Sequence, residues 1–95
     1  MSDPLKKTVK IANQRGLHAR AAAKFVHLAT RFECQVRVSR ENQTMDGKSI
    51  MGILLLAAAR GSTLTISAEG LDEQAAVDAL CHLVDSGFGG ESWNA

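Results

Sequence analysis

The stretch Thr63-Leu64-Thr65-Ile66-Ser67-Ala68 decides the fold, because it alternates polar and apolar residues more clearly than any other part of the chain. A period of two predicts a β-strand with one buried face, and Glu69-Gly70 ends it. A turn at Glu41-Asn42-Gln43 joins two further strands into a hairpin. The other predicted strands are Lys7 to Ala12, Gln35 to Arg40 and Thr44 to Asp46.

Three helices are predicted between and after these strands, because apolar residues recur there at helical spacing. The first runs from Ala19 to about Arg31, and the second, which Ser49 can cap, runs to about Ala58. The third follows the acidic pair Asp72-Glu73, which suits the first turn of a helix. The apolar stripes are Ala22, Phe25, Val26 and Ala29 in the first helix, and Ala76, Val77, Leu80, Leu83 and Val84 in the third.

The resulting order, β-α-β-β-α-β-α, predicts an α+β fold of the open-faced sandwich type. In that fold a four-stranded, mainly antiparallel sheet is covered on one face by three helices. We expect residues 1–95 to form a single domain, with a loosely ordered C-terminal tail over about residues 87–95. Trp93 in that tail either docks on the domain or is exposed.

The composition is typical of a compact soluble domain, with 45% hydrophobic and 22% charged residues. The longest apolar run, residues 53–59, is much shorter than the ~20 residues of a membrane span, so we expect no direct membrane insertion. Cys34 and Cys81 lie far apart, and the N-terminus does not resemble a secretory signal. We therefore expect a cytoplasmic protein with reduced thiols.

The basic residues are unevenly distributed, since all 11 lysines and arginines lie in residues 1–60. This asymmetry predicts an electropositive surface for phosphate or an acidic partner, although an uneven solvated surface explains it equally well. We expect no nucleic-acid binding, because the chain has no Tyr and no aromatic pair on a strand to stack bases. No metal site is predicted, because the His and Cys residues lack the close spacing of zinc ligands.

The segment Gly16-Leu17-His18-Ala19-Arg20 places a histidine at the start of the first predicted helix. The first backbone N–H groups of a helix have no partner within it, so they bind phosphoryl oxygens well. A neutral imidazole has a ring nitrogen that can attack phosphorus. The planar guanidinium of Arg20 can contact the same oxygens, and Lys24 extends the positive rim. His18 is therefore the candidate phosphoryl acceptor.

Local sequence alone leaves an alternative open, because a lone histidine before a helix is more often a cap or a surface residue. No carboxylate lies nearby in the sequence to act as a base, and the chain has no P-loop or nucleotide fingerprint. We therefore expect a phosphoryl carrier and not an enzyme, with no cofactor and with its catalysis supplied by a partner.

Three stretches together resemble the HPr phosphocarrier family of the phosphoenolpyruvate-dependent phosphotransferase system: Gly16 to Arg20, Lys48-Ser49 and Thr65 to Gly70. The resemblance covers residues 5–86 and implies the same fold. It also implies that phosphorylated Enzyme I transfers its phosphoryl group to His18, which passes it to a histidine of an EIIA-type protein while Arg20 stabilises the group. Ser49 matches the family's regulatory serine, which an HPr kinase/phosphorylase phosphorylates in many bacteria.

Ala21 departs from the family pattern, because many carriers of sugar transport have proline there. Together with Gly52, it resembles carriers of proteobacterial regulatory systems, including the nitrogen-type (NPr-like) branch, as much as sugar carriers. The alternative function is that of a binding-only regulatory paralogue that docks on target proteins. We expect a monomer whose partner-binding residues are Leu17, Lys24, Ile50 and Met51.

Overall fold

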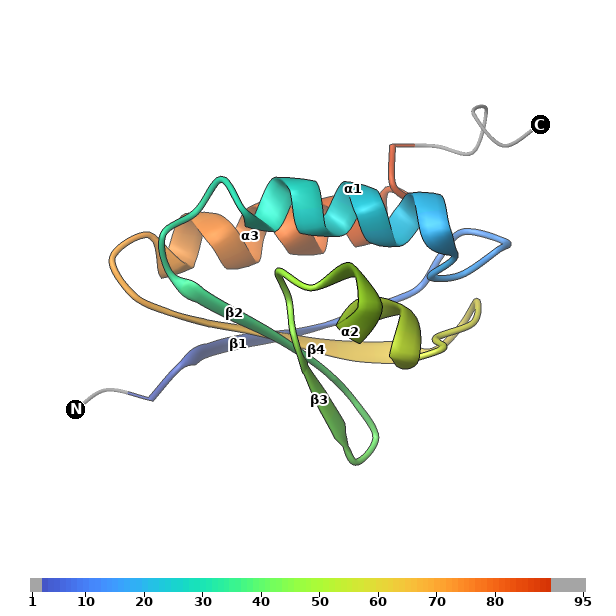
Figure 1. Cartoon of the computed structure of the whole chain (residues 1–95), viewed down its shortest axis with the longest axis horizontal. Helices are drawn as coiled ribbons and strands as arrows, with labels where there is room; N and C mark the ends of the chain where they lie inside the picture. The colour runs from blue at the N-terminus through green and yellow to red at the C-terminus, as the bar shows by residue number, and fades with distance from the viewer. Residues whose placement is uncertain (1–2, 90–95) are drawn as a thin grey trace.

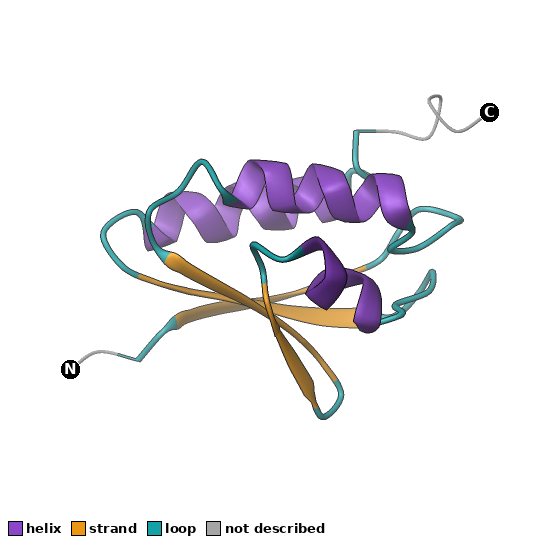
Figure 2. Ribbon diagram, viewed as in Figure 1, coloured by secondary structure: helices purple, strands orange, loops and turns teal. Residues whose placement is uncertain are grey.

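The computed structural model describes residues 3–89 and arranges them as a sheet with helices on one of its faces (Figures 1 and 2). The elements are β1 (Leu5–Lys10), α1 (Ala19–Ala29), β2 (Gln35–Arg40), β3 (Gln43–Asp46), α2 (Ile50–Leu55), β4 (Thr63–Glu69) and α3 (Glu73–Asp85). The strands lie in the order β1-β4-β2-β3, and every neighbouring pair among them is antiparallel. The predicted open-faced α+β fold is therefore confirmed.

Strand β4 is a central strand of the sheet, and its alternation of polar and apolar residues determines which face of the sheet is buried. Leu64 and Ile66 are both fully buried against the helices. Thr65 lies between them and is paired with Thr8 of β1 on one side and with Ser39 of β2 on the other. The polar side chains of this row face away from the helices, as the period of two predicts.

Helices α1 and α3 lie side by side over the sheet and bury the stripes that their periodicity predicts (Figure 1). The buried residues are Ala21, Ala22, Phe25, Val26 and Ala29 in α1, and Ala76, Val77, Leu80 and Val84 in α3. Leu83, which was also expected in the α3 stripe, is only partly buried. Within residues 3–89, no helix has the length and apolar character that a membrane span requires.

Helix α2 is shorter than predicted, because it ends at Leu55 and not near Ala58. Its C-cap, Leu56, is followed by Ala57, which has a φ of 49° and so lies in the left-handed region. A residue in that conformation cannot continue a right-handed helix. The chain then passes the β1–α1 loop, where the Leu17 N–H donates to the Ala58 carbonyl, and it turns at residues 60–61 before β4 begins.

The prediction of a loosely ordered tail from residue 87 was wrong for its first residues. Phe88 is fully buried, and its N–H donates to the Leu83 carbonyl at 2.8 Å. Its own carbonyl accepts a hydrogen bond from the Lys24 ammonium at 3.0 Å. The free energy gained by burying an aromatic side chain exceeds the cost of ordering the neighbouring flexible glycines. The rest of the predicted tail, residues 90–95 with Trp93, lies outside the described residues.

Candidate functional site

The turn before α1 is held in place by two hydrogen bonds and a glycine. Gly16 has a φ of 65°, and a Cβ added there would overlap the Ala58 carbonyl oxygen and lie 2.9 Å from the Ala59 Cα. The Leu17 N–H donates to that same Ala58 oxygen at 2.9 Å. Asn13, only 3% exposed, donates from Nδ2 to the Gly16 carbonyl at 2.9 Å. The contacts with Ala58 and Asn13 therefore hold the backbone of the turn that leads into His18.

His18 is the N-cap residue of α1, as the sequence predicted. Its backbone is extended, with φ −78° and ψ 177°, and its carbonyl accepts the Ala22 N–H at 2.8 Å. The His18 side chain does not cap the helix. The residue as a whole is half-buried, and its ring nitrogen Nε2 is buried. The imidazole thus lies at the helix end where the electrostatic field favours an anion.

Arg20 and Lys24 follow His18 on α1 but differ in exposure. Arg20 is exposed in the first turn of the helix, where a guanidinium suits the binding of phosphoryl oxygens. Lys24 is half-buried, and its ammonium donates to the Phe88 carbonyl. Lys24 therefore links α1 to the segment that follows α3, a contact that the sequence did not predict.

Ser49 caps α2, because its hydroxyl oxygen accepts the Gly52 N–H at 3.0 Å. The predicted contact residues Ile50 and Met51 follow it and are 44% and 68% exposed. Leu55, one turn further along, is 60% exposed and belongs to the same apolar surface. The sequence signal for Leu55 was its spacing of four from Met51, which places both on one face of the helix.

A hollow of about 570 Å³ joins this surface to α1. Its lining residues are Ala23, Lys24, Val26, His27, Thr30 and Ile50. Large exposed apolar residues beside a hollow are typical of protein-binding surfaces. We call Ile50, Met51 and Leu55, together with this hollow, the α1–α2 surface.

Leu17 was predicted as a partner-binding residue, and this prediction was wrong. Its side chain is 5% exposed and belongs to the core. The hydrogen bond from its N–H to Ala58 holds the backbone close to the α2–β4 loop, so the side chain turns inward. The residue of the turn that sequence reasoning missed is Asn13, whose role depends on a carbonyl that only the folded turn brings near.

The two cysteines do not form a reactive site. Burial raises the pKa of the Cys34 thiol and of the Cys81 thiol, so neither forms a thiolate readily near neutral pH. Asp72 lies near Cys34, and its carboxylate accepts the N–H groups of Glu33 and Cys34, each at 2.9 Å. These bonds hold the pKa of Asp72 below its usual range. Among the described residues, no group of His, Cys, Asp and Glu could hold a metal ion.

The comparisons with known proteins cover most of the chain. Residues 5–86 match the family model described as the PTS HPr component phosphorylation site. A phosphocarrier protein HPr of Cupriavidus necator is 49% identical over 90% of this chain and 96% of its own length. A phosphocarrier protein NPr of Shewanella violacea is 39% identical over 88% of this chain and 92% of its own.

A solved structure agrees with the fold as well as with the sequence. It is an HPr of Thermoanaerobacter tengcongensis with a TM-score of 0.88 and 45% identity, covering 92% of this chain and 98% of that one. The half-buried histidine at the start of α1 lies within the matched region. The chain therefore belongs to the HPr family, the phosphocarrier proteins of the phosphotransferase system.

Proposed function

We propose that His18 carries the phosphoryl group and that Arg20 stabilises the group during transfer. The observation that carries this proposal is the position of His18 at the N-cap of α1, on a turn fixed by Asn13 and Gly16. Because Nε2 is buried, Nδ1 is the ring nitrogen that a donor can approach. Attack by Nδ1 requires the ring proton to be on Nε2.

The transfer exchanges one nitrogen–phosphorus bond for another. The donor is the phosphohistidine of Enzyme I, and the His18 Nδ1 lone pair forms the new bond while the donor's bond breaks. The N–H groups at the start of α1 and the Arg20 guanidinium offset the charge on the phosphoryl oxygens. A histidine of an EIIA-type protein then attacks the same phosphorus. The carrier supplies position and electrostatics, and its partners complete each transfer site.

Docking on the α1–α2 surface brings partner histidines to His18 in this proposal. The surface combines exposed apolar residues of α2 with Lys24 of α1, and Arg20 lies on the same helix, which suits acidic partners with an apolar patch. A cytoplasmic monomer meets Enzyme I and EIIA in turn through this one surface. A regulator that only docks would use the same surface without accepting phosphate.

Phosphorylation of Ser49 is the proposed regulation of this surface. A phosphate there carries a charge of about −1.5 to −2, which the N-terminus of α2 tolerates. The same charge lies directly before Ile50 and Met51, two exposed apolar residues of the docking surface on α2. We therefore expect a kinase such as HPr kinase/phosphorylase to weaken docking without unfolding the carrier.

Incubation with phosphoenolpyruvate, magnesium and Enzyme I separates the carrier from the binding-only alternative. We expect acid-labile phosphate on the wild-type chain and on His82→Ala, whose histidine is exposed on α3 and lies outside the α1–α2 surface. His18→Ala should accept none while keeping the wild-type circular-dichroism spectrum. Acid-labile phosphate that persists in His18→Ala, or that never forms on wild type, would overturn the proposal.

A further inference from the structure

Three successive residues after α3 have a left-handed backbone. Their φ angles are 69° at Gly87, 61° at Phe88 and 84° at Gly89. Glycine adopts this conformation readily, whereas an aromatic residue adopts it rarely and at a cost in free energy. Such residues persist where neighbouring contacts hold them, and they concentrate at functional sites. The contacts of Phe88 therefore indicate what its conformation achieves.

The backbone of Phe88 connects the end of α3 to α1. Its N–H donates to the Leu83 carbonyl at 2.8 Å, and its carbonyl accepts the Lys24 ammonium at 3.0 Å, across 64 positions of the sequence. A Cβ added at Gly89 would lie 3.7 Å from the Lys24 Nζ, so the chain also passes beside this ammonium group. In a right-handed continuation of α3 the Phe88 carbonyl would point along the helix axis. The left-handed turn is therefore what makes the bond to α1 possible.

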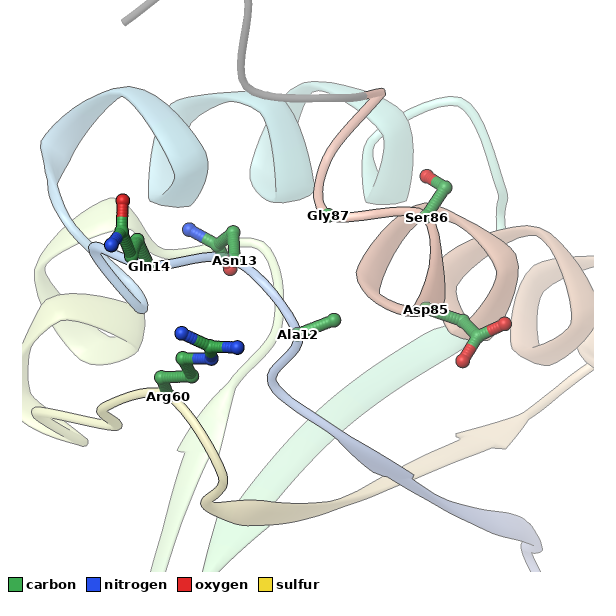
Figure 3. Close-up of a pocket in the computed structure, with 7 residues that line it drawn as sticks. All are labelled: Ala12, Asn13, Gln14, Arg60, Asp85, Ser86 and Gly87. Carbon is green, nitrogen blue, oxygen red and sulfur yellow. The ribbon is translucent and has the colours of Figure 1, made fainter.

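The same segment is held by its other neighbours. Figure 3 shows Gly87 at the wall of an open pocket, between Ser86 at the end of α3 and Asn13 of the β1–α1 loop. A Cβ added at Gly87 would lie 3.7 Å from the Asn13 Cβ. The Ser86 hydroxyl oxygen accepts the Gly89 N–H at 3.1 Å, and the Phe88 ring is fully buried. The Phe88 carbonyl is therefore held in place before any partner arrives.

Lys24, which this carbonyl binds, belongs to the α1–α2 surface. It is half-buried and lines the hollow of that surface. An unrestrained lysine side chain loses rotamer entropy when it pairs with a partner. A hydrogen bond to a fixed carbonyl removes part of that freedom already in the unbound carrier. An ammonium group has three donors, so a bond to a carbonyl is compatible with an ion pair to a carboxylate.

We propose that Phe88 is a positioning residue for docking, which acts by holding the Lys24 ammonium ready for a carboxylate of the partner protein. This role rests on the proposed use of the α1–α2 surface and adds to it a residue that lies outside that surface. The partner that fits best has an acidic side chain at the rim of the apolar patch that meets Ile50 and Met51. Because Phe88 preorganises one ion pair, it raises the affinity of docking and does not change the chemical step.

A double-mutant cycle on the Kd for Enzyme I tests this coupling. Enzyme I is titrated with the unphosphorylated full chain and without phosphoenolpyruvate, so no phosphoryl transfer by His18 takes part. We expect Lys24→Met to weaken binding about fourfold and Phe88→Ala to weaken it about threefold. In the Lys24→Met background, Phe88→Ala should weaken binding less than about 1.5-fold. Leu80→Ala, which also removes a fully buried side chain, is the control for lost stability and should leave the Kd unchanged.

A second measurement uses only the wild-type chain, so it does not depend on a variant that could fail to fold. ¹⁵N relaxation of the lysine ammonium groups reports how well ordered each of them is. We expect a higher order parameter for Nζ of Lys24 than for Nζ of Lys10, an exposed lysine of β1.

Two results would overturn the role of Phe88 and leave the proposed function intact. The first is an equal order parameter at Lys24 and Lys10, since the Lys24 ammonium would then not be positioned. The second is an equal loss of affinity from Phe88→Ala in both backgrounds, or a loss as large in Leu80→Ala, since Phe88 would then act only through stability. A wild-type chain that does not bind Enzyme I would refute the proposed docking surface, and the role of Phe88 with it.

Discussion

Gly16→Ala should destabilise the fold and impair the turn that carries His18. A non-glycine residue at the Gly16 φ of 65° costs about 1–2 kcal/mol. The added Cβ would also overlap the Ala58 oxygen, so the hydrogen bond from Leu17 to that oxygen must lengthen or break. Loss of that bond adds about 1–3 kcal/mol. We therefore expect a total loss of about 2–5 kcal/mol, which most domains of this size survive.

Gly61→Ala is the matched control for this substitution. Gly61 has a φ of 89°, but a Cβ added there would have no atom within 4 Å. The control should lose only the conformational contribution of about 1–2 kcal/mol. Urea unfolding measures both free energies, and the rate of phosphorylation by Enzyme I reports on the turn. Equal losses of stability in the two variants, or a wild-type rate in folded Gly16→Ala, would refute the role assigned to the Gly16 contact.

Three other perturbations test separate parts of the structure. Phe88→Ala should lower the unfolding free energy by about 3–5 kcal/mol in urea, because the ring is fully buried; a loss below about 1 kcal/mol would contradict its place in the core. Asp72→Asn should destabilise the protein at pH 7 but not at acidic pH. The folded-state pKa of Asp72 is lowered, so its contribution is present above the unfolded value of ~4 and is lost as the pH falls through the folded value. A loss of unfolding free energy that is the same at both pH values would contradict this role of the ionised Asp72 carboxylate. Ser49→Asp should slow phosphoryl transfer while Ser49→Asn, which also caps α2, should not; equal transfer rates would exclude a charge effect.

The sequence predicted the elements whose patterns are purely local. The alternation of residues 63–68 and the stripe of α1 are decided by burial on one face, and both appear in the structure as expected. The end of α2 was not predictable in this way, because Ala57 is left-handed where the chain must turn toward the β1–α1 loop. Phe88 was missed because its glycine neighbours suggest flexibility, whereas its burial depends on a cavity that only the packed helices create.

The candidate site also has residues that a local pattern predicts and residues that only the folded chain reveals. His18 was predicted because a helix start can be read from a short segment, and the structure places it at the N-cap of α1. Leu17 was wrongly placed on the surface, since a single residue in a turn has no periodicity to show which way it points. Asn13 has no sequence signal at all, because its hydrogen bond to Gly16 depends on the shape of the folded turn.

The most direct test of the central claim is to identify the phosphorylated atom. Phosphorylation of the ¹⁵N-histidine-labelled chain by Enzyme I, followed by NMR of the imidazole nitrogens, distinguishes the two ring positions and the three histidines. The burial of Nε2 predicts a phosphoryl group on Nδ1 of His18 and on neither His27 nor His82. Phosphate on His18 Nε2, or on another histidine, would contradict the account.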